Sequence, residues 1–279
     1  LLTGLLFTPV FESLYGLIFD NLLLCSLVLV LWLERRGRIQ WSGWVFGAVA
    51  TLKLYPALLL LWLPAMRCWR ALLPAGVAAI LLVVAGALVF GIDNSLFYYR
   101  DLLPLLLGEP SLDQPGNFSP GRFFLTALGD PANAMRGFWV FKHLLLLAVV
   151  AVLWRTRTAS TAGPRTPALR LSALTCLLLL YLPNYWGNYQ LVLLLPVLTL
   201  LANAHARERG WVIQGLAAML CWGLMLFAND HNGFYVPWGL GSSPALVQAM
   251  TAWRPLCPLL LLLVILAVLA WPATTGRRS

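Results

Sequence analysis

A lysine interrupts one of the apolar segments of this 279-residue chain. The segment runs from Trp44 to Trp62, carries Lys53 and Tyr55 near its middle, and has arginines beyond both ends. A lysine ammonium deep in hydrocarbon costs roughly 2.5 to 3.5 kcal/mol on insertion scales, so such a residue marks a candidate functional site. In the alternative interpretation, Lys53 reaches an interface or pairs with an acid such as Asp20.

The longest polar stretch, residues 91–137, brings together side chains that recognise sugars or phosphates. Asn117, Ser119 and Arg122 follow one another closely in it, and their amide, hydroxyl and guanidinium groups suit a sugar hydroxyl or a phosphate. Long connections are usually functional or disordered, and the interleaved aromatic residues argue against disorder. We therefore predict a partly helical active-site loop here. An ordinary Pro/Gly turn closed by an asparagine side chain is the alternative.

A second polar cluster interrupts the apolar residues 169–203. Its sequence is Leu182-Pro183-Asn184-Tyr185-Trp186-Gly187-Asn188-Tyr189-Gln190. Aromatic faces stack on pyranose rings while amides bond hydroxyl groups, so Asn184, Trp186 and Asn188 could form a sugar platform. An interfacial aromatic belt explains the same residues equally well. A third patch, residues 229–235, is polar enough to join the site.

Two acids, Glu12 and Asp20, lie at the outer end of the first predicted crossing helix. A carboxylate there could act as a general base that deprotonates an acceptor hydroxyl. In the alternative it is the partner of a nearby cation. The sequence predicts no cofactor, since the phosphate-binding and zinc-binding motifs are missing and the five cysteines are scattered. The need for a divalent metal is left open.

Composition places the chain in a membrane. It is 61% hydrophobic and 10% charged, with a mean hydropathy of +0.82, whereas soluble domains carry roughly 25% charged residues. The long apolar stretches match the ~20 residues that a helix needs to cross a bilayer, so we predict an all-α, polytopic transmembrane helical bundle. The predicted crossing helices are residues 14–33, 71–91, 138–154, 169–183, 188–203, 211–228 and 255–271.

The basic connections predict how the chain is threaded, because cytoplasmic loops are enriched in Lys and Arg. These connections are residues 34–38, 67–70, 155–170, 207–209 and 277–278. All can be cytoplasmic only if the Lys53 segment, residues 43–66, enters and leaves on one side, which puts 13 of the 19 Lys and Arg residues inside. A single crossing would leave 8 inside. We therefore predict a re-entrant hairpin around a cavity, with the long loop outside. The net charge of +9 fits these loops and anionic lipid, and nucleic acid is not implied.

The order of these features resembles glycosyltransferase family 87, polytopic enzymes of the GT-C superfamily that use polyprenyl-phosphate sugars. The resemblance covers about residues 1–205. Its sharpest element is the succession of Arg35-Arg36-Gly37-Arg38, Leu52-Lys53-Leu54-Tyr55-Pro56 and the basic loop from Arg67 to Arg70. Tyr15-Gly16 and Asn21-Leu22-Leu23 precede these motifs, and Asn117-Phe118-Ser119 and Pro183-Asn184-Tyr185-Trp186 follow them.

The resemblance implies a membrane hexosyltransferase. It would transfer a single mannose-like hexose from a polyprenyl-phosphate donor to a glycan or glycolipid acceptor on the outer face of the bacterial inner membrane. The donor phosphate needs a cation near the membrane surface, and the candidates for binding it are Lys53, Tyr55 and Arg122. The candidates for sugar and acceptor are Asn21, Asn117, Ser119, Asn184, Trp186 and Asn188.

The resemblance also bears on the catalytic base. In such enzymes the base is usually an aspartate in the first outer loop, which would lie upstream of Leu1, so we expect a single transmembrane domain that is a C-terminal portion. Asp20 is then the candidate base within this chain. The sequence Phe19-Asp20-Asn21 departs from the Gly-Gln pair that family members carry before the asparagine. Inversion at the anomeric carbon needs one base and no covalent intermediate.

Two other functions are compatible with the sequence. The chain could be a transporter or flippase of a lipid-linked sugar or small solute, with the broken Lys53 segment as a gate. It could also be a scaffold subunit of an envelope-assembly complex. A large outer cavity closed on the cytoplasmic side favours the enzyme, whereas gates on both sides favour transport.

Overall fold

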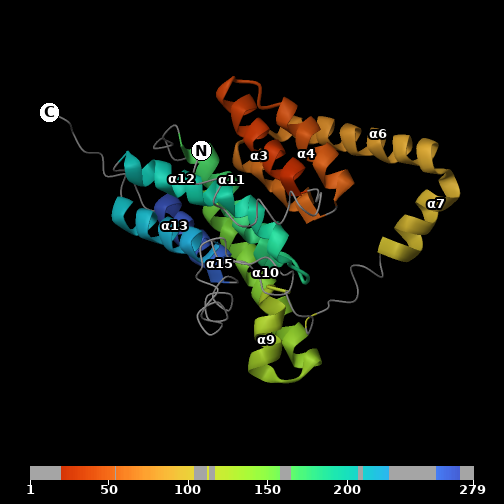
Figure 1. Cartoon of the computed structure of the whole chain (residues 1–279). Helices are drawn as coiled ribbons and strands as arrows, with labels where there is room; N and C mark the ends of the chain where they lie inside the picture. Colours follow the sequence, from red (N-terminus) through yellow and green to blue (C-terminus); the bar gives the residue numbers. More distant parts are fainter. Residues whose placement is uncertain are drawn as a thin grey trace, which may run out of the picture.

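The computed structural model describes residues 20–53, 55–103, 112, 117–157, 165–206, 210–225 and 256–270. Every element in these ranges is a helix (Figure 1). The elements are α3 (Asp20–Arg35), α4 (Trp41–Leu52), η1 (Tyr55–Leu61), α5 (Trp62–Ala65), η2 (Trp69–Ala71), α6 (Leu72–Phe90), α7 (Ile92–Phe97), η3 (Tyr98–Leu102), α9 (Pro120–Leu128), α10 (Pro131–Thr156), α11 (Thr166–Tyr181), η4 (Gly187–Leu193), α12 (Leu194–His205), α13 (Trp211–Met225) and α15 (Cys257–Ala270).

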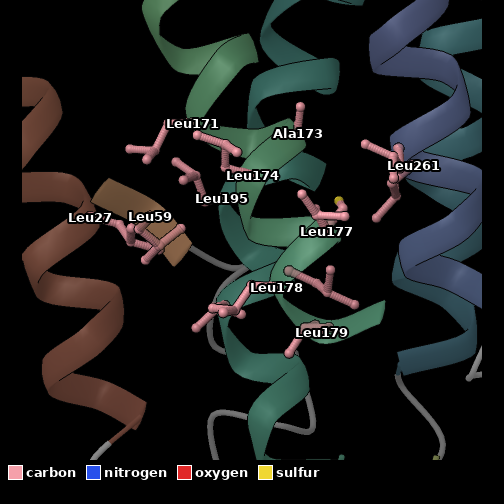
Figure 2. Close-up of a cluster of buried hydrophobic side chains, with 14 of the residues drawn as sticks. Leu27, Leu59, Leu171, Ala173, Leu174, Leu177, Leu178, Leu179, Leu195 and Leu261 are labelled. Carbon is pink, nitrogen blue, oxygen red and sulfur yellow. The ribbon is translucent and has the colours of Figure 1, made fainter. Parts of the chain in front are cut away.

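Helix α11 is the centre of the bundle. All its residues from 169 to 180 are buried, as expected for a helix that is apolar around its whole circumference. Figure 2 shows its leucines pointing to different neighbours: Leu174 and Leu178 face the side of α3, η1 and α12, and Leu177 faces Leu261 of α15. The core therefore surrounds α11, with α3, η1 and α12 on one side of it and α15 on another.

Helices α4 and α6 run parallel in close contact. A Cβ atom on Gly43 would lie 2.0 Å from the carbonyl oxygen of Ala71, and one on Gly47 would lie 2.1 Å from that of Ala75. Since both contacts join residues with the same sequence offset, the two helices start at the same level and point the same way. The chain between them must consequently double back, and it does so at Lys53, where α4 ends.

The returning arm of this hairpin is fixed to the start of α11. The guanidinium of Arg170 donates to the carbonyl oxygens of Ala65 at 3.0 Å and of Thr156 at 2.7 Å. The indole nitrogen of Trp62 donates to the carbonyl oxygen of Pro167 at 3.0 Å. Three of the predicted basic connections, over their described residues 34–38, 67–70, 155–157 and 165–170, therefore lie at one end of the bundle.

In the part of the chain that the structure describes, two helices, Trp69–Phe90 and Pro131–Thr156, are long and apolar enough to cross a membrane. In their most apolar windows only 11% and 22% of the residues are buried. A core helix of a soluble protein would be mostly buried, so the exposed apolar faces of these two helices favour contact with lipid. In Figure 1, α6 extends away from the bundle and α9 packs beside the start of α10.

Over the described residues, each predicted crossing helix overlaps a helical segment of the structure, in the same order along the chain. The helix predicted over 71–91 is α6. The helix observed at the predicted range 138–154 is α10, which extends beyond the prediction at both ends. It begins at Pro131, directly after the capping side chain of Asp130. The prediction for 188–203 differs in type, since its first part is the 3-10 helix η4. Parts of the predicted 14–33 and 211–228 helices lie outside the described residues.

Candidate functional site

Lys53 lies where two short helices meet. Pro56 has no N–H group to donate to the carbonyl of Leu52, so α4 cannot continue through this position. Lys53 takes an extended backbone conformation, with φ −144° and ψ 121°, and the chain resumes as the 3-10 helix η1 at Tyr55. The lysine side chain is thus presented at the tip of the hairpin.

The tip carries a cluster of four side chains, which we call the lysine cluster: Asp20, Lys53, Tyr55 and Tyr189. The ammonium nitrogen of Lys53 lies 3.0 Å from Oδ1 of Asp20, and the hydroxyl of Tyr55 donates to the same oxygen. The rings of Tyr55 and Tyr189 stack with centres 5.3 Å apart. The ammonium lies 4.4 Å from the ring centre of Tyr189 and 5.0 Å from that of Tyr55.

The two charged members of the lysine cluster differ in burial. The Asp20 side chain is 0% exposed, whereas that of Lys53 is 25% exposed. A carboxylate and two ring faces therefore hold an ammonium group in one orientation while part of it stays accessible. The pairing of Lys53 with Asp20, the alternative that the sequence left open, is present in the structure.

A second group of residues, the asparagine cluster, consists of Asn117, Ser119, Asn184 and Tyr185. Oδ1 of Asn117 accepts from the backbone N–H groups of Ser119 at 2.9 Å and of Tyr185 at 3.1 Å. Its Nδ2 donates to the carbonyl oxygen of Pro183 at 3.3 Å and to Oδ1 of Asn184 at 3.4 Å. The N–H of Phe118 also donates to the carbonyl oxygen of Tyr185 at 2.7 Å.

These bonds use the full capacity of the Asn117 amide, which offers two donors and two acceptor positions. Asn117 is also only 1% exposed. Its side chain ties the start of α9 to the connection between α11 and η4, and this connection leads on to Tyr189 of the lysine cluster. The structure thereby brings together the two polar stretches that the sequence singled out separately.

The remaining predicted residues are distributed around the two clusters. Arg122, on α9, donates to the carbonyl oxygen of Asn117 at 3.5 Å, and Ser119 is buried. Asn21 follows Asp20 in the first turn of α3 and, like Asn184 and Trp186, is partly exposed. The side chain of Asn188, Glu12 and the patch 229–235 lie outside the described residues. In the described ranges, no three His, Cys, Asp or Glu side chains form a metal-binding group.

Two tyrosines were not among the predicted site residues. Tyr189 covers the Lys53 ammonium, and Tyr185, which is fully buried, pairs with the 117–118 backbone. Both belong to the aromatic stretch 182–190 that the sequence marked as a sugar platform. Nothing in the spacing separates a ring that contacts a cation from one that would contact a sugar, so only the fold could assign them.

The model of glycosyltransferase family 87 matches residues 1–183 of the chain. The match spans 183 of the 279 residues and includes Asp20, Lys53, Tyr55 and Asn117. The chain belongs to glycosyltransferase family 87. This confirms the family that the sequence resembled, and it makes the protein a glycosyltransferase with apolar helices suited to a membrane. No curated protein matches the chain, and no solved structure matches it.

Proposed function

We propose that this glycosyltransferase transfers one mannose-like hexose from a polyprenyl-phosphate donor to a glycan or glycolipid on the extracytoplasmic face of the bacterial inner membrane. The observation that carries the proposal is the position of Lys53, an oriented and partly accessible ammonium at the tip of an apolar hairpin. A lipid-borne phosphate has an anionic head at the interface and an apolar tail in lipid, and such a tip is complementary to it.

The geometry of the hairpin supports its re-entrant placement. Basic residues flank both arms, and the contacts of Gly43 with Ala71 and of Arg170 with Ala65 bring these flanks to the same end of the bundle. From Trp41 to Leu52, α4 rises about 18 Å at 1.5 Å per residue. With the basic end in the cytoplasm, the tip would lie in the outer half of a ~30 Å hydrocarbon core.

In the proposed reaction, Lys53 and Tyr55 bind the donor phosphate, and Arg122 approaches it from the outer loop. The cation stabilises the phosphate as it leaves the anomeric carbon. Asp20 is proposed to position Lys53, because its Oδ1 already accepts from both Lys53 and Tyr55. A general base needs an oxygen directed at the acceptor hydroxyl, and this geometry favours the positioning role over that of base.

Recognition of the sugar is proposed for the connection between α11 and η4. Asn184 and Trp186 are partly exposed there and offer an amide and an aromatic face, and Asn21 and Asn188 are proposed on the same side of the donor. Asn117 and Ser119 are buried, and Asn117 donates to Asn184. We propose that these two residues act by holding the connection in place.

The test is sugar transfer by the purified protein in proteoliposomes. The donor is polyprenyl-phosphate mannose, the acceptor probe is octyl mannoside, and the released polyprenyl phosphate is measured together with the product. Lys53→Met should reduce kcat/KM at least about 100-fold, the effect expected for loss of about 3 kcal/mol of transition-state stabilisation. The matched control Arg136→Met removes one exposed positive charge of α10 and should keep normal turnover.

Three results would contradict the proposal. Normal turnover by Lys53→Met would exclude the phosphate-binding role. Transfer from a nucleotide sugar in place of the lipid donor would exclude the proposed donor class. Movement of the intact donor across the bilayer without cleavage would favour the transporter.

A further inference from the structure

The chain has two lysines, and the second lies in a cluster that the proposed function does not use. Lys142 is on α10, within one of the two helices long enough to cross a membrane, and is 8% exposed. Its ammonium nitrogen is surrounded by aromatic rings. It lies 4.1 Å from the ring centre of Trp139, 4.9 Å from that of Tyr181 and 5.2 Å from that of Phe138.

Lys142 differs from Lys53 in having no carboxylate partner among the residues that the structure describes. The ring faces attract its charge, but they do not neutralise it. An ammonium group has three N–H donors and no acceptor, and a lysine in a membrane-crossing helix ordinarily has a counter-ion. Within the described part of the chain, the cluster therefore lacks an anion with several acceptor atoms.

His143 links two of the rings around Lys142, those of Trp139 and Tyr181. Nδ1 of His143 lies 2.7 Å from the carbonyl oxygen of Trp139, which can only accept, so this nitrogen carries a proton. In the neutral ring Nε2 is then the acceptor, and the hydroxyl of Tyr181 lies 3.3 Å from it. His143 also stacks on Trp139 with ring centres 4.5 Å apart. The cage around Lys142 is consequently formed before any ligand arrives.

The surroundings of the cage indicate where the anion comes from. Trp139, which forms one wall of the cage, is 53% exposed, whereas Leu144 and Leu147, which are 61% and 65% exposed, lie on the opposite face of α10 from Lys142. Such an apolar surface faces lipid, and tryptophan is the residue typical of headgroup level. Lys142 also lies about 21 Å from Thr156 at 1.5 Å per residue. An anion that reaches this depth from the lipid side is attached to a lipid.

We propose that Lys142, in the cage formed by Phe138, Trp139 and Tyr181, binds the phosphate group of a membrane lipid at a site separate from Lys53. A phosphate supplies several acceptor oxygens for one ammonium group. Both an anionic phospholipid and a polyprenyl phosphate present this chemistry. The inference concerns binding alone, so it stands or falls independently of the proposed sugar transfer.

The experiment is native mass spectrometry of the purified chain in detergent, titrated separately with phosphatidylglycerol, polyprenyl phosphate and diacylglycerol, which has no phosphate. The variant is Lys142→Met, which keeps an unbranched side chain against the rings, and the control is Arg136→Met on the exposed start of the same helix. Wild type and Arg136→Met should retain at least one phosphate lipid in preference to diacylglycerol. Lys142→Met should bind that lipid about tenfold more weakly or worse, as for loss of a charge-assisted contact.

The outcomes separate the sources and can overturn the proposal. A loss confined to phosphatidylglycerol assigns the site to a phospholipid, and a loss confined to polyprenyl phosphate assigns it to the lipid carrier. Equal retention by Lys142→Met and wild type would overturn the proposal. Failure of wild type to prefer either phosphate lipid over diacylglycerol would overturn it without recourse to any variant, so the test does not depend on the folding of Lys142→Met.

Discussion

Asp20 and Lys53, thirty-three residues apart in sequence, form an ion pair of 3.0 Å in which the Asp20 carboxylate is fully buried and the Lys53 ammonium is partly exposed. Asp20 is the first described residue of α3 and Lys53 directly follows the last residue of α4, so their contact joins α3 to the tip of the hairpin. The asymmetry in burial has a consequence for stability. Removing the Lys53 ammonium leaves the Asp20 carboxylate as a buried, unpaired charge, whereas removing the Asp20 carboxylate leaves an ammonium that water can reach.

We expect Lys53→Met and Asp20→Asn to lower the stability by different amounts, and we expect the double variant to regain most of the lost stability. Lys53→Met should lower the free energy of unfolding by about 2 to 4 kcal/mol and Asp20→Asn by about 1 to 2 kcal/mol. The double variant should come within about 1 kcal/mol of wild type, because it buries no charge. Thermal unfolding in detergent measures the cycle, and losses that simply add would show that the pair is not coupled.

The ring of Tyr189 should matter more than its hydroxyl. Tyr189→Phe keeps a π face 4.4 Å from the Lys53 ammonium, whereas Tyr189→Leu removes it. We expect the leucine variant to lose about 0.5 to 1 kcal/mol of stability beyond the phenylalanine variant, the usual strength of a cation–π contact. Under the proposed function, sugar transfer should fall in the same order. Equal stability and equal sugar transfer of the two variants would show that the Tyr189 ring does not stabilise the Lys53 ammonium.

The close approach of α4 and α6 should be intolerant of a methyl group. A Cβ atom at Gly47 would lie 2.1 Å from the backbone oxygen of Ala75, and backbone cannot move aside locally. Gly47→Ala should destabilise the protein by about 1 to 3 kcal/mol, as overpacking does. The control is Gly76→Ala on α6, where nothing lies within 4 Å, and it should be neutral or stabilising. Similar melting temperatures for both variants would contradict this packing.

The amide of Asn117 should be required for stability, because both its oxygen and its nitrogen are bonded. Asn117→Asp keeps the oxygen that accepts from Ser119 and Tyr185 but places a second oxygen against the acceptors of Pro183 and Asn184. We expect a loss of about 1 to 3 kcal/mol in unfolding free energy. Asn94→Asp is the control, because Asn94 is exposed and bonds only within its own turn. A control that loses as much as Asn117→Asp would show a general charge effect.

The two ends of the hairpin should face the same compartment. In a protein whose other cysteines are replaced, Cys68 and an introduced Arg36→Cys should both react with a membrane-impermeant maleimide from the cytoplasmic side. The contacts that join Gly43 to Ala71 and Ala65 to Arg170 place these positions at one end of the bundle. Labelling of the two positions from opposite sides would exclude the re-entrant hairpin.

Much of the helical layout could be predicted because apolar length alone specifies a crossing helix. Residues 71–91 illustrate this, since α6 starts and ends within one residue of the prediction. The 3-10 character of η4 could not be predicted in the same way. Its sequence, from Gly187 to Leu193, passes from the polar cluster into the apolar residues that follow, and this pattern does not specify 3-10 winding. In the structure η4 packs against α3, α11 and α12.

The sequence by itself determined the class of the protein, the family, the break at Lys53 and the two polar stretches around Asn117 and Asn184. These follow from composition, local spacing and the backbone restriction at Pro56, all of which act over short distances along the chain. Only the tertiary structure decided that Lys53 pairs with Asp20 beneath Tyr189, that the Asn117 amide bonds to backbone groups and to Asn184, and that no acid of the described residues pairs with Lys142 in its ring cage. The contacts of Lys53 with Asp20, of Asn117 with Tyr185 and of Lys142 with Tyr181 join residues distant in sequence, and packing of whole helices around α11 selects them.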